Sequence, residues 1–308
     1  MLDRFRRCCN RDDGSIAQRV HVPELPEVET MVRLVRPLLI GRTVTGSQIG
    51  WVRTLGGATH ARLRSLVHDR TFLTAGRRAK YILLGLSAKG QPEATEVDTW
   101  LVIHLRMTGR LMVEPEAEPA SKHARVCLSL DNETRLEFID PRKFGRFVPT
   151  RDYEDVMPPL GPEPLEQDFT AEFLLDELAL RRGRIKSLLL DQSFLAGLGN
   201  IYVDESLFEA RIHPQTPANR IPRPKIRILH AAIRRTLEEA ILREGSSFDT
   251  FYRTPEGQPG SYQNQFQVYG RHGKPCRVCS RKLSRIVVAQ RGTHFCPSCQ
   301  RLPRAAAR

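Results

Sequence analysis

The sequence predicts an α+β protein with an N-terminal antiparallel β-sandwich and leading helix, a helical middle domain, and a C-terminal hairpin built round four cysteines. Three observations predict this arrangement. Short β-rich runs alternate with turn residues from about residue 42 to 150, helical patterns fill residues 170–245, and two Cys-x2-Cys pairs close the chain. Because the chain has 308 residues, more than one domain is expected.

Changes in composition mark the expected boundaries. Residues 1–22 have mixed charge and no hydrophobic periodicity, and the stretch LGPEPLEQDF at 160–169 is Pro-rich and acidic, as expected of a linker. The expected segments are an extension at 1–22, a β-sandwich domain at 23–155, a helical domain at 156–257 and a cysteine module at 258–303.

The leading helix is expected from about Pro23, in PELPEVETMVRLVRPLL. Pro26 suits a first helical turn, where its missing N–H would have no partner in any case. The apolar residues recur at the spacing of one helix face: Val28, Met31, Val32 and Val35. This pattern predicts an amphipathic helix packed on a core.

The expected strands lie in TVTGSQIGWV, YILLGL, WLVIHLRM, RVCLSL and RLEFI, with exposed loops at 87–98 and 114–122. The expected helices contain FLLDELAL, IKSLLLDQ, YVDESLFEA and KIRILHAAIRRTLEEAILREG. Asn200, directly after a Gly-Leu-Gly turn, is expected to be the N-cap of the third of these helices. Residues 253–265 are polar and predict a further loop.

The charge of the chain points to a polyanionic partner. The formal net charge is +13, and the residues after Glu256 include ten cations and no acid. Nucleic acid is the commonest polyanion available to a protein, although a merely basic enzyme is the alternative. No apolar run approaches the about 20 residues that span a bilayer, and no secretory signal is evident, so a cytoplasmic location is expected.

Four cysteines predict a metal site. Cys276 and Cys279 form one Cys-x2-Cys pair, and Cys296 and Cys299 form a second pair after sixteen intervening residues. Two such pairs are typical of a structural Zn2+ held by four thiolates, and two disulfides or inert thiols are the alternative. Because cysteines would fill all four positions on the metal, the zinc is expected to be structural and to hold a hairpin over KLSRIVVAQRGTHF. Cys127 alternates with apolar residues and is expected to be a core thiol.

Five blocks together carry a family resemblance: PELPEVET (23–30), HLRMTG (104–109), DPRKFG (140–145), GLGNIYVDE (197–205) and the four cysteines. In this order and spacing they make the chain resemble bacterial formamidopyrimidine-DNA glycosylase from Pro23 to about Gln300. The resemblance implies a helix–two-turn–helix DNA-binding domain and a zinc finger. It also implies an enzyme that removes oxidised purines, such as 8-oxoguanine and formamidopyrimidines, from double-stranded DNA and then nicks the strand.

The resemblance implies that Pro23 is the nucleophile. In such enzymes the proline of PELPE is the mature N-terminus, and its amine attacks the sugar and forms an iminium ion. An amide nitrogen cannot do this because its lone pair is delocalised into the carbonyl group. Twenty-two residues precede Pro23 here. Either Val22 marks the true start, as a GTG initiator whose methionine is removed, or the extension is retained and the protein needs processing or binds DNA without cutting it.

Three further catalytic residues follow from the resemblance. Glu24 matches the general acid, with an ordinary helix N-terminal carboxylate as the alternative, and Glu27 is expected to support it through hydrogen bonds. Lys80 matches the lysine that binds the phosphate beside the lesion and transfers a proton in β-elimination. The neighbouring Arg77 and Arg78 are expected to strengthen this phosphate site. The tip of the zinc hairpin is expected to project the arginine implicated in δ-elimination, Arg291.

The remaining site residues are expected to hold DNA. Met107, Arg142 and Phe144 match the residues that fill the gap left when the damaged base is flipped out of the stack. The expected contacts to the DNA backbone are His123, Arg182, Lys186 and Asn200. Residues 253–265 match the loop that closes over the everted base. The chain is expected to act as a monomer, near the nucleoid.

Two alternatives remain open from sequence. One is the related endonuclease VIII branch, which prefers oxidised pyrimidines, although PELPEVE and DPRKFG favour the purine branch. The other is a catalytically silent DNA-binding homologue, which is expected if residues 1–22 persist.

Overall fold

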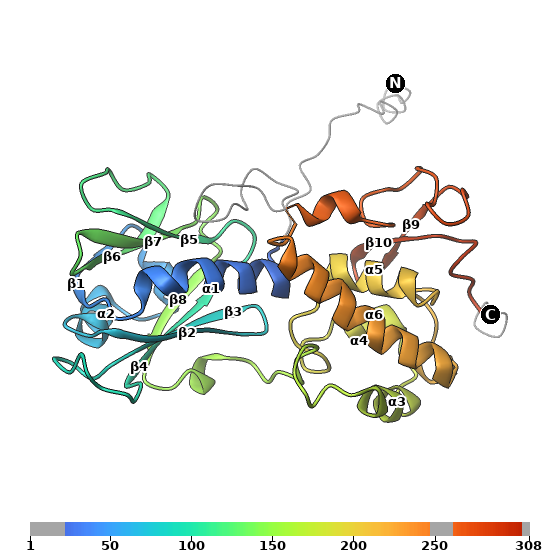
Figure 1. The fold of residues 1–308 in the computed structure, drawn as a ribbon, viewed down its shortest axis with the longest axis horizontal. Helices are drawn as coiled ribbons and strands as arrows, with labels where there is room; N and C mark the ends of the chain where they lie inside the picture. The colour runs from blue at the N-terminus through green and yellow to red at the C-terminus, as the bar shows by residue number, and fades with distance from the viewer. Residues whose placement is uncertain (1–21, 247–260, 304–308) are drawn as a thin grey trace, which may run out of the picture.

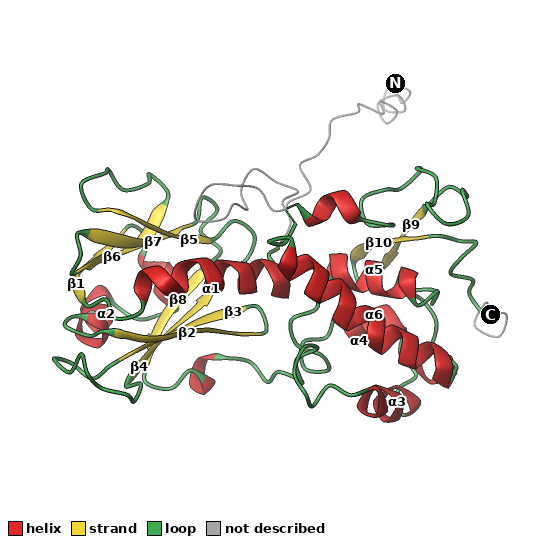
Figure 2. Cartoon of the chain, in the orientation of Figure 1, coloured by secondary structure: helices red, strands yellow, loops and turns green. Residues whose placement is uncertain are grey.

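The computed structural model describes residues 22–246 and 261–303. Figure 1 shows two lobes, a β-rich lobe and a helical lobe that also carries the C-terminal hairpin, joined by helix α1 (Leu25–Leu39) and by the linker that includes residues 160–169. Figure 2 shows that the strands lie in the first lobe, apart from the C-terminal hairpin. Within the described ranges, no helix is long and apolar enough to cross a membrane. The extension at 1–21 and residues 253–260 of the expected closing loop lie outside the described residues.

The first lobe is the expected antiparallel sandwich. One sheet has the order β1-β6-β7-β5: β1 (Val44–Ile49), β6 (Ala124–Leu130), β7 (Thr134–Ile139) and β5 (Arg110–Pro115). The other has the order β2-β3-β4-β8: β2 (Phe72–Arg78), β3 (Tyr81–Leu86), β4 (Thr99–His104) and β8 (Arg146–Thr150). Leu84, Ile103, Leu128 and Phe138 are among the fully buried residues of one shared core. The two sheets therefore enclose the apolar side chains that the alternating pattern predicted.

Three strands and one helix of this lobe were not expected from sequence. Strand β5 ends at a proline, β8 contains Pro149, and β2 ends in two arginines, so none has the pattern of a regular apolar run. Helix α2 (His60–Val67) has only eight residues, and its Thr59 cap accepts a hydrogen bond from the Arg62 N–H. Two short 3-10 helices, η1 (Val52–Leu55) and η2 (Glu154–Val156), complete the lobe.

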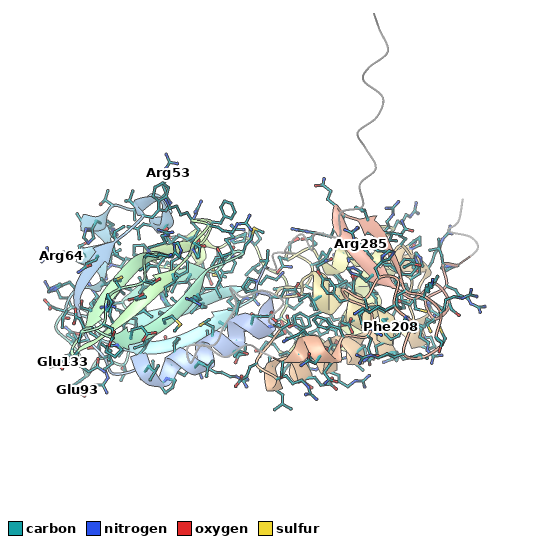
Figure 3. The ribbon with its side chains drawn as sticks, turned by 90° about the horizontal axis from the view of Figure 1, so that it is seen from above. Arg53, Arg64, Glu93, Glu133, Phe208 and Arg285 are labelled. Carbon is teal, nitrogen blue, oxygen red and sulfur yellow. The ribbon has the colours of Figure 1, made fainter. Side chains whose placement is uncertain are left out.

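The leading helix α1 belongs to both lobes. Its predicted apolar face, from Val28 to Val35, is fully buried in the sandwich core. Leu25, at its start, lies instead in the core of the helical lobe, together with Tyr202 and Leu207. The helix therefore connects the two cores, and its N-terminus lies at their junction (Figures 1 and 3).

The second lobe contains the four predicted helices, α3 (Ala171–Ala179), α4 (Ile185–Leu189), α5 (Asn200–Glu209) and α6 (Arg223–Leu242), with the 3-10 helices η3 (Ala218–Arg220) and η4 (Tyr262–Gln265). Helices α4 and α5 are linked by the Gly-rich turn and form the helix–two-turn–helix element. Gly199, and not Asn200, is the N-cap of α5, so the expected cap is wrong by one residue: Asn200 already has helical geometry.

The C-terminal module is a β-hairpin of β9 (Ser284–Val288) and β10 (Arg291–Phe295). Ala289 and Gln290 both have positive φ, as a two-residue hairpin turn of the right twist requires. Arg291 pairs with Val288 directly beside this turn and is exposed. The hairpin therefore presents Arg291 at its tip, as the sequence predicted.

Candidate active site

The start of helix α1 is closed by two glutamates. Glu24 is the N-cap, and its backbone N–H donates to Glu27 Oε2 at 2.9 Å, which completes a capping box. Pro23 precedes this cap and is buried. The sequence PELPE thus folds into a helix N-terminus that holds Pro23 and the Glu24 carboxylate next to each other.

A second helix begins at the same place. Glu24 Oε1 accepts the Ile201 N–H of α5 at 3.1 Å, and the Leu25 N–H donates to the Gly197 carbonyl at 3.2 Å. A Cβ atom on Gly199 would lie 2.2 Å from Glu24 Cδ, so a side chain there would displace the Glu24 carboxylate. The motifs PELPE and GLGN are therefore two sides of one site, at which two helix N-termini meet a carboxylate.

Burial raises the pKa of the Glu24 carboxyl group into the neutral range. Loss of solvation and the neighbouring Glu27 raise the pKa of Glu24 to about 7, although Lys80 and the Ile201 N–H oppose this shift. Its second oxygen, Oε2, is buried and has no hydrogen-bond partner among the described residues. A carboxyl group with this pKa can give up a proton at the pH of the cell.

Glu27 supports the site as predicted. Its Oε1 accepts hydrogen bonds from the Tyr202 hydroxyl and from both the backbone N–H and the hydroxyl of Ser246. Sequence reasoning did not single out Tyr202 or Ser246, because each is more than 170 residues from Glu27 along the chain.

Lys80 reaches the site from the turn between β2 and β3. Its Nζ donates to the Leu198 carbonyl of the Gly-rich turn at 2.7 Å. Burial and Arg291 lower the pKa of Lys80, whereas Glu24 and Glu27 raise it. The expected catalytic residues from the two lobes are therefore close enough to influence one another's charge.

Arg77 and Arg78 have a different role from the one expected. Arg77 binds Glu29 at 3.1 Å and Glu163 at 2.6 Å, and Arg78 binds Glu163 at 3.2 Å and the Gly161 carbonyl at 2.8 Å. Their guanidinium groups hold the linker against the β2–β3 turn. The phosphate role expected for them is therefore corrected, because their charges are already paired.

Lys186 lies in a buried ion pair. Its side chain is fully buried, and Nζ donates to Asp204 Oδ1 at 2.6 Å. The other oxygen, Asp204 Oδ2, accepts the His294 N–H of β10 at 2.7 Å. Through Asp204, the Lys186 ammonium group therefore helps to dock the zinc hairpin on α5.

Asn200 contributes to the same docking. Its Nδ2 donates to the Gly292 carbonyl at 3.0 Å, one residue after Arg291. The helix–two-turn–helix element and the hairpin tip are therefore joined beside the Gly-rich turn. Arg182 lies exposed between α3 and α4.

The predicted gap-filling residues lie on two loops of the sandwich. Phe144 is 48 % exposed, and the Arg142 guanidinium lies 5.0 Å from its ring centroid. Met107 is half-buried in the turn between β4 and β5. The half-buried His123 lies just before β6, where its carbonyl accepts the Asp140 N–H at 3.0 Å.

The four predicted metal ligands come together. The sulfurs of Cys276, Cys279, Cys296 and Cys299 all lie within 4.8 Å of one another. Two of the separations are 4.0 and 3.4 Å, close to the about 3.8 Å between sulfurs at the corners of a zinc–thiolate tetrahedron. The donor set and its geometry fit a structural Zn2+. Cys127 is buried in β6, as expected of a core thiol.

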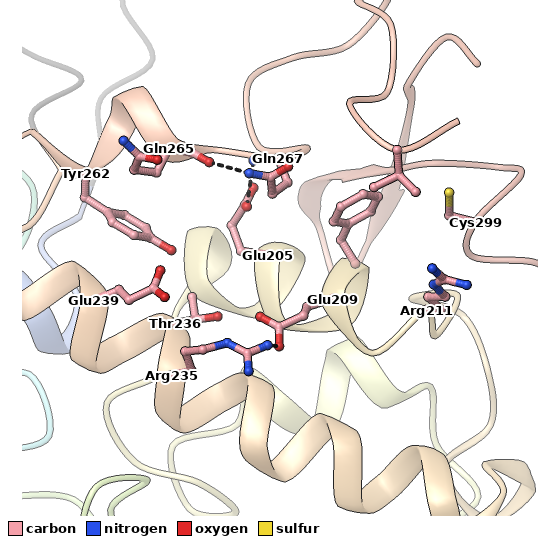
Figure 4. Close-up of a pocket in the computed structure, with 12 residues that line it drawn as sticks. Glu205, Glu209, Arg211, Arg235, Thr236, Glu239, Tyr262, Gln265, Gln267 and Cys299 are labelled. Carbon is pink, nitrogen blue, oxygen red and sulfur yellow. Dashed lines mark hydrogen bonds and ion pairs between the residues drawn. The ribbon is translucent and has the colours of Figure 1, made fainter. Parts of the chain in front are cut away.

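A pocket lies apart from this site, between α5, α6 and the zinc module (Figure 4). Its polar groups bind one another: Arg235 pairs with Glu209, and Glu205 accepts the N–H groups of Gln267 and Val268. Of the predicted site residues, only Cys299 is among those that line it. The pocket is therefore not the predicted active site.

Three family comparisons match successive parts of the chain. Residues 22–147 match the formamidopyrimidine-DNA glycosylase N-terminal domain, and residues 160–252 match the formamidopyrimidine-DNA glycosylase H2TH domain. Residues 273–302 match the zinc finger found in FPG and IleRS, so the four cysteines form a structural zinc site.

Individual relatives agree with these matches. The formamidopyrimidine-DNA glycosylase of Chloroflexus aurantiacus is 45% identical over 284 residues, which cover 91% of this chain and 98% of the relative. The crystal structure of MutM (Fpg) from Thermus thermophilus has a TM-score of 0.78 at 40% identity and covers 91% and 100% of the two chains. Lactococcus lactis Fpg in complex with DNA containing an abasic site has a TM-score of 0.81 at 34% identity, with the same coverage. The chain belongs to the formamidopyrimidine-DNA glycosylase family.

Proposed function

We propose that this chain is a bifunctional DNA glycosylase and AP lyase that removes oxidised purines, including 8-oxoguanine and formamidopyrimidines, from double-stranded DNA. The observation that carries the proposal is that Glu24, which directly follows Pro23, and Lys80 both bind the Gly-rich turn and first turn of α5, at the junction of two helix N-termini. The Chloroflexus relative is named formamidopyrimidine-DNA glycosylase. Lactococcus lactis Fpg has been captured with abasic DNA, and a mutant of it with DNA containing Fapy-dG.

The first step needs a free amine at Pro23, so the active form is proposed to begin there. A terminal amine titrates near about 8, and a useful fraction is therefore uncharged at neutral pH. The Pro23 nitrogen donates its lone pair to the anomeric carbon, and the bond from that carbon to the base breaks. Glu24 supplies the proton that the sugar oxygen or the departing base requires.

Loss of the proton on the Pro23 nitrogen and opening of the C1′–O4′ bond of the sugar ring, with a proton delivered to O4′, then give the iminium ion. The second step uses this iminium ion as an electron sink. Removal of a C2′ proton lets the C3′–O3′ bond break, which is the β-elimination that nicks the strand. Lys80 is proposed to bind the adjacent phosphate and to take part in this proton transfer. Arg291 is proposed to bind the phosphates beside the lesion and to promote the following δ-elimination.

Double-stranded DNA is the proposed partner. Met107, Arg142 and Phe144 are proposed to fill the gap left by the everted base. The proposed contacts to the DNA backbone are His123, Arg182, Lys186 and Asn200. The chain is proposed to act on its DNA as a monomer, in the cytoplasm at the nucleoid.

Borohydride trapping tests this proposal. A form that begins at Pro23 should give a covalent adduct with a duplex that contains 8-oxoguanine. The same form with its Pro23 nitrogen acetylated should lose the adduct, because an amide nitrogen has no lone pair to donate, and should still bind the duplex, since phosphate contacts do not depend on the amine. Affinity should fall steeply with salt, because each phosphate contact releases counterions. Undiminished trapping in the acetylated form would place the nucleophile elsewhere.

A further inference from the structure

Asp140 is a fully buried carboxylate that takes no part in the proposed chemistry. It lies directly after β7, at the start of the DPRKFG block. A buried carboxylate is costly unless several donors satisfy it. The donors that satisfy Asp140 show what it holds in place.

All of these donors belong to the two loops that carry the gap-filling residues. Asp140 Oδ1 accepts the hydroxyl of Thr108, which directly follows Met107. The same oxygen accepts the Arg142 N–H at 3.3 Å, and Oδ2 accepts the Gly145 N–H at 2.7 Å. One side chain therefore binds the Met107 loop and both ends of the Arg142–Phe144 loop.

A third loop is attached through the backbone. The Asp140 N–H donates to the His123 carbonyl at 3.0 Å, and the Asp140 carbonyl accepts from Arg125 Nε at 2.7 Å. His123, Met107, Arg142 and Phe144 thus all lie on segments that are fixed to this one residue.

The loops could not approach Asp140 without specific local features. A Cβ atom on Gly145 would lie 2.4 Å from the Phe138 ring and 3.1 Å from Asp140 Oδ2, so a side chain there would push the loop away. On the other loop, Arg106 has a φ of +54°, and its N–H donates to His104 Nδ1 at 3.0 Å. Gly145 therefore allows its loop to approach the Asp140 carboxylate, and the left-handed turn at Arg106 leads into the loop whose Thr108 binds the same carboxylate.

We propose that Asp140 is a positioning residue that preassembles Met107, Arg142 and Phe144 as one unit for insertion into the gap left by an everted base. The inference rests on the proposed function and adds the device that orders these three side chains before DNA arrives. Ordering loops in advance removes a cost that binding would otherwise carry.

Asp140→Asn tests the proposal in the full chain. The substitution keeps the shape of the side chain but replaces one acceptor oxygen by a donor, so at least one of the N–H groups loses its partner. The probe is a duplex with a tetrahydrofuran abasic analogue opposite 2-aminopurine, whose fluorescence reports insertion beside the orphaned base. We expect insertion to be about tenfold slower or less complete, because a hydrogen bond to a charged group is lost. Affinity for undamaged duplex should change less than about twofold.

Three further substitutions keep the test decisive. Asp131→Asn is the matched control: it alters an exposed carboxylate at the opposite end of β7, which accepts the Thr43 N–H, and it should leave insertion unchanged. Thr108→Val removes only the link to the Met107 loop and should slow insertion, whereas Thr108→Ser, which keeps the hydroxyl, should restore it. If Asp140→Asn does not fold, the comparison of Thr108→Val with Thr108→Ser tests the proposal instead.

Different experimental outcomes would show that the inference about Asp140 is wrong and that the proposed function is wrong. If the parent chain gives no fluorescence change with the abasic analogue, the proposed function is wrong. If the parent inserts normally and Asp140→Asn and Thr108→Val insert equally well, the role of Asp140 is wrong. In a form that begins at Pro23, borohydride trapping on a single-stranded abasic oligonucleotide, which has no gap to fill, should be the same with and without Asp140→Asn. A loss of trapping there would show a general structural defect and overturn the inference.

Discussion

At the scale of single residues, the site depends on a glutamate that is held partly protonated near neutral pH. Burial dominates the environment of Glu24 and raises its pKa to about 7. The same carboxylate also accepts a free N–H group from the first turn of α5. Glu24 therefore combines the two roles that the sequence left as alternatives, a helix-end carboxylate and a candidate acid.

This pKa predicts the pH dependence of base removal. Glu24 must be protonated to act as an acid, and the protonated fraction falls as the pH rises through about 7. The Pro23 amine must be uncharged, and that fraction falls as the pH drops below about 8. Single-turnover excision of 8-oxoguanine should therefore follow a bell-shaped curve with its maximum between these values.

Glu24→Gln should identify the acid. The variant should excise about 100-fold more slowly or worse, and its remaining rate should no longer fall on the alkaline side. The parent acting on a preformed abasic site, which has no base to protonate, serves as the control. An alkaline fall that persists in Glu24→Gln would assign that limb to another group.

The sequence could indicate a candidate role for those residues whose chemistry depends on adjacent residues in the chain. Adjacent Pro23 and Glu24 and the Cys-x2-Cys pairs are of this kind. The buried ion pair of Lys186 could not be predicted, because its partner, Asp204, is 18 residues away and carries no local signal. A basic residue in a DNA-binding domain is interpreted as a phosphate contact until its buried partner is known.

At the scale of elements, the zinc hairpin is held on the helix–two-turn–helix element by buried polar contacts. Lys186 and Asp204 are both fully shielded from solvent, and Asp204 also receives the His294 N–H. Removing one member of a buried pair leaves the other charge without compensation.

Lys186→Met should therefore destabilise the chain by about 3 kcal/mol or more. Lys186→Met combined with Asp204→Leu should recover part of this loss, since no buried charge then remains. Urea unfolding measures both values, and Arg182→Met, which alters an exposed arginine of the same domain, is the control. A small effect of Lys186→Met, equal to that of Arg182→Met, would contradict a docking role.

Helices and most strands were predictable because their hydrophobic periods are regular. The four helices of the second lobe and the β3, β4, β6 and β7 strands overlap the expected runs, with bounds that differ by a few residues. Strands β5 and β8 were not expected because each contains a proline, and their place in the sheets depends on neighbours such as β7 and β4. Hydrogen bonding to neighbouring strands of the same sheet therefore places β5 and β8, whose local β-propensity alone does not predict strands.

At the scale of the whole molecule, two lobes are joined at the site itself. The order of the domains could be predicted from the sequence, but the sharing of α1 between two cores could not, since Leu25 and Val28 are only three residues apart and are buried in different clusters. Residues 160–169 were expected only to link two domains. Instead, Glu163 is almost completely buried and accepts the Ala79 N–H at 2.6 Å, next to Lys80. Glu93 and Glu133 lie at the end of the sandwich lobe away from this junction (Figure 3).

Glu163 should therefore couple the linker to the catalytic turn. Glu163→Gln retains one acceptor but loses the charge that Arg77 and Arg78 share, and should lower the free energy of unfolding by about 1–3 kcal/mol. Because Ala79 precedes Lys80, Glu163→Gln should also reduce borohydride trapping on an abasic duplex. This further loss should disappear in a Lys80→Met background, because that variant has no lysine ammonium group left to position. Glu166→Gln, at an exposed position of the same linker, is the matched control. If the loss of trapping caused by Glu163→Gln is the same with Lys80 and without it, the linker stabilises the fold but does not position the lysine.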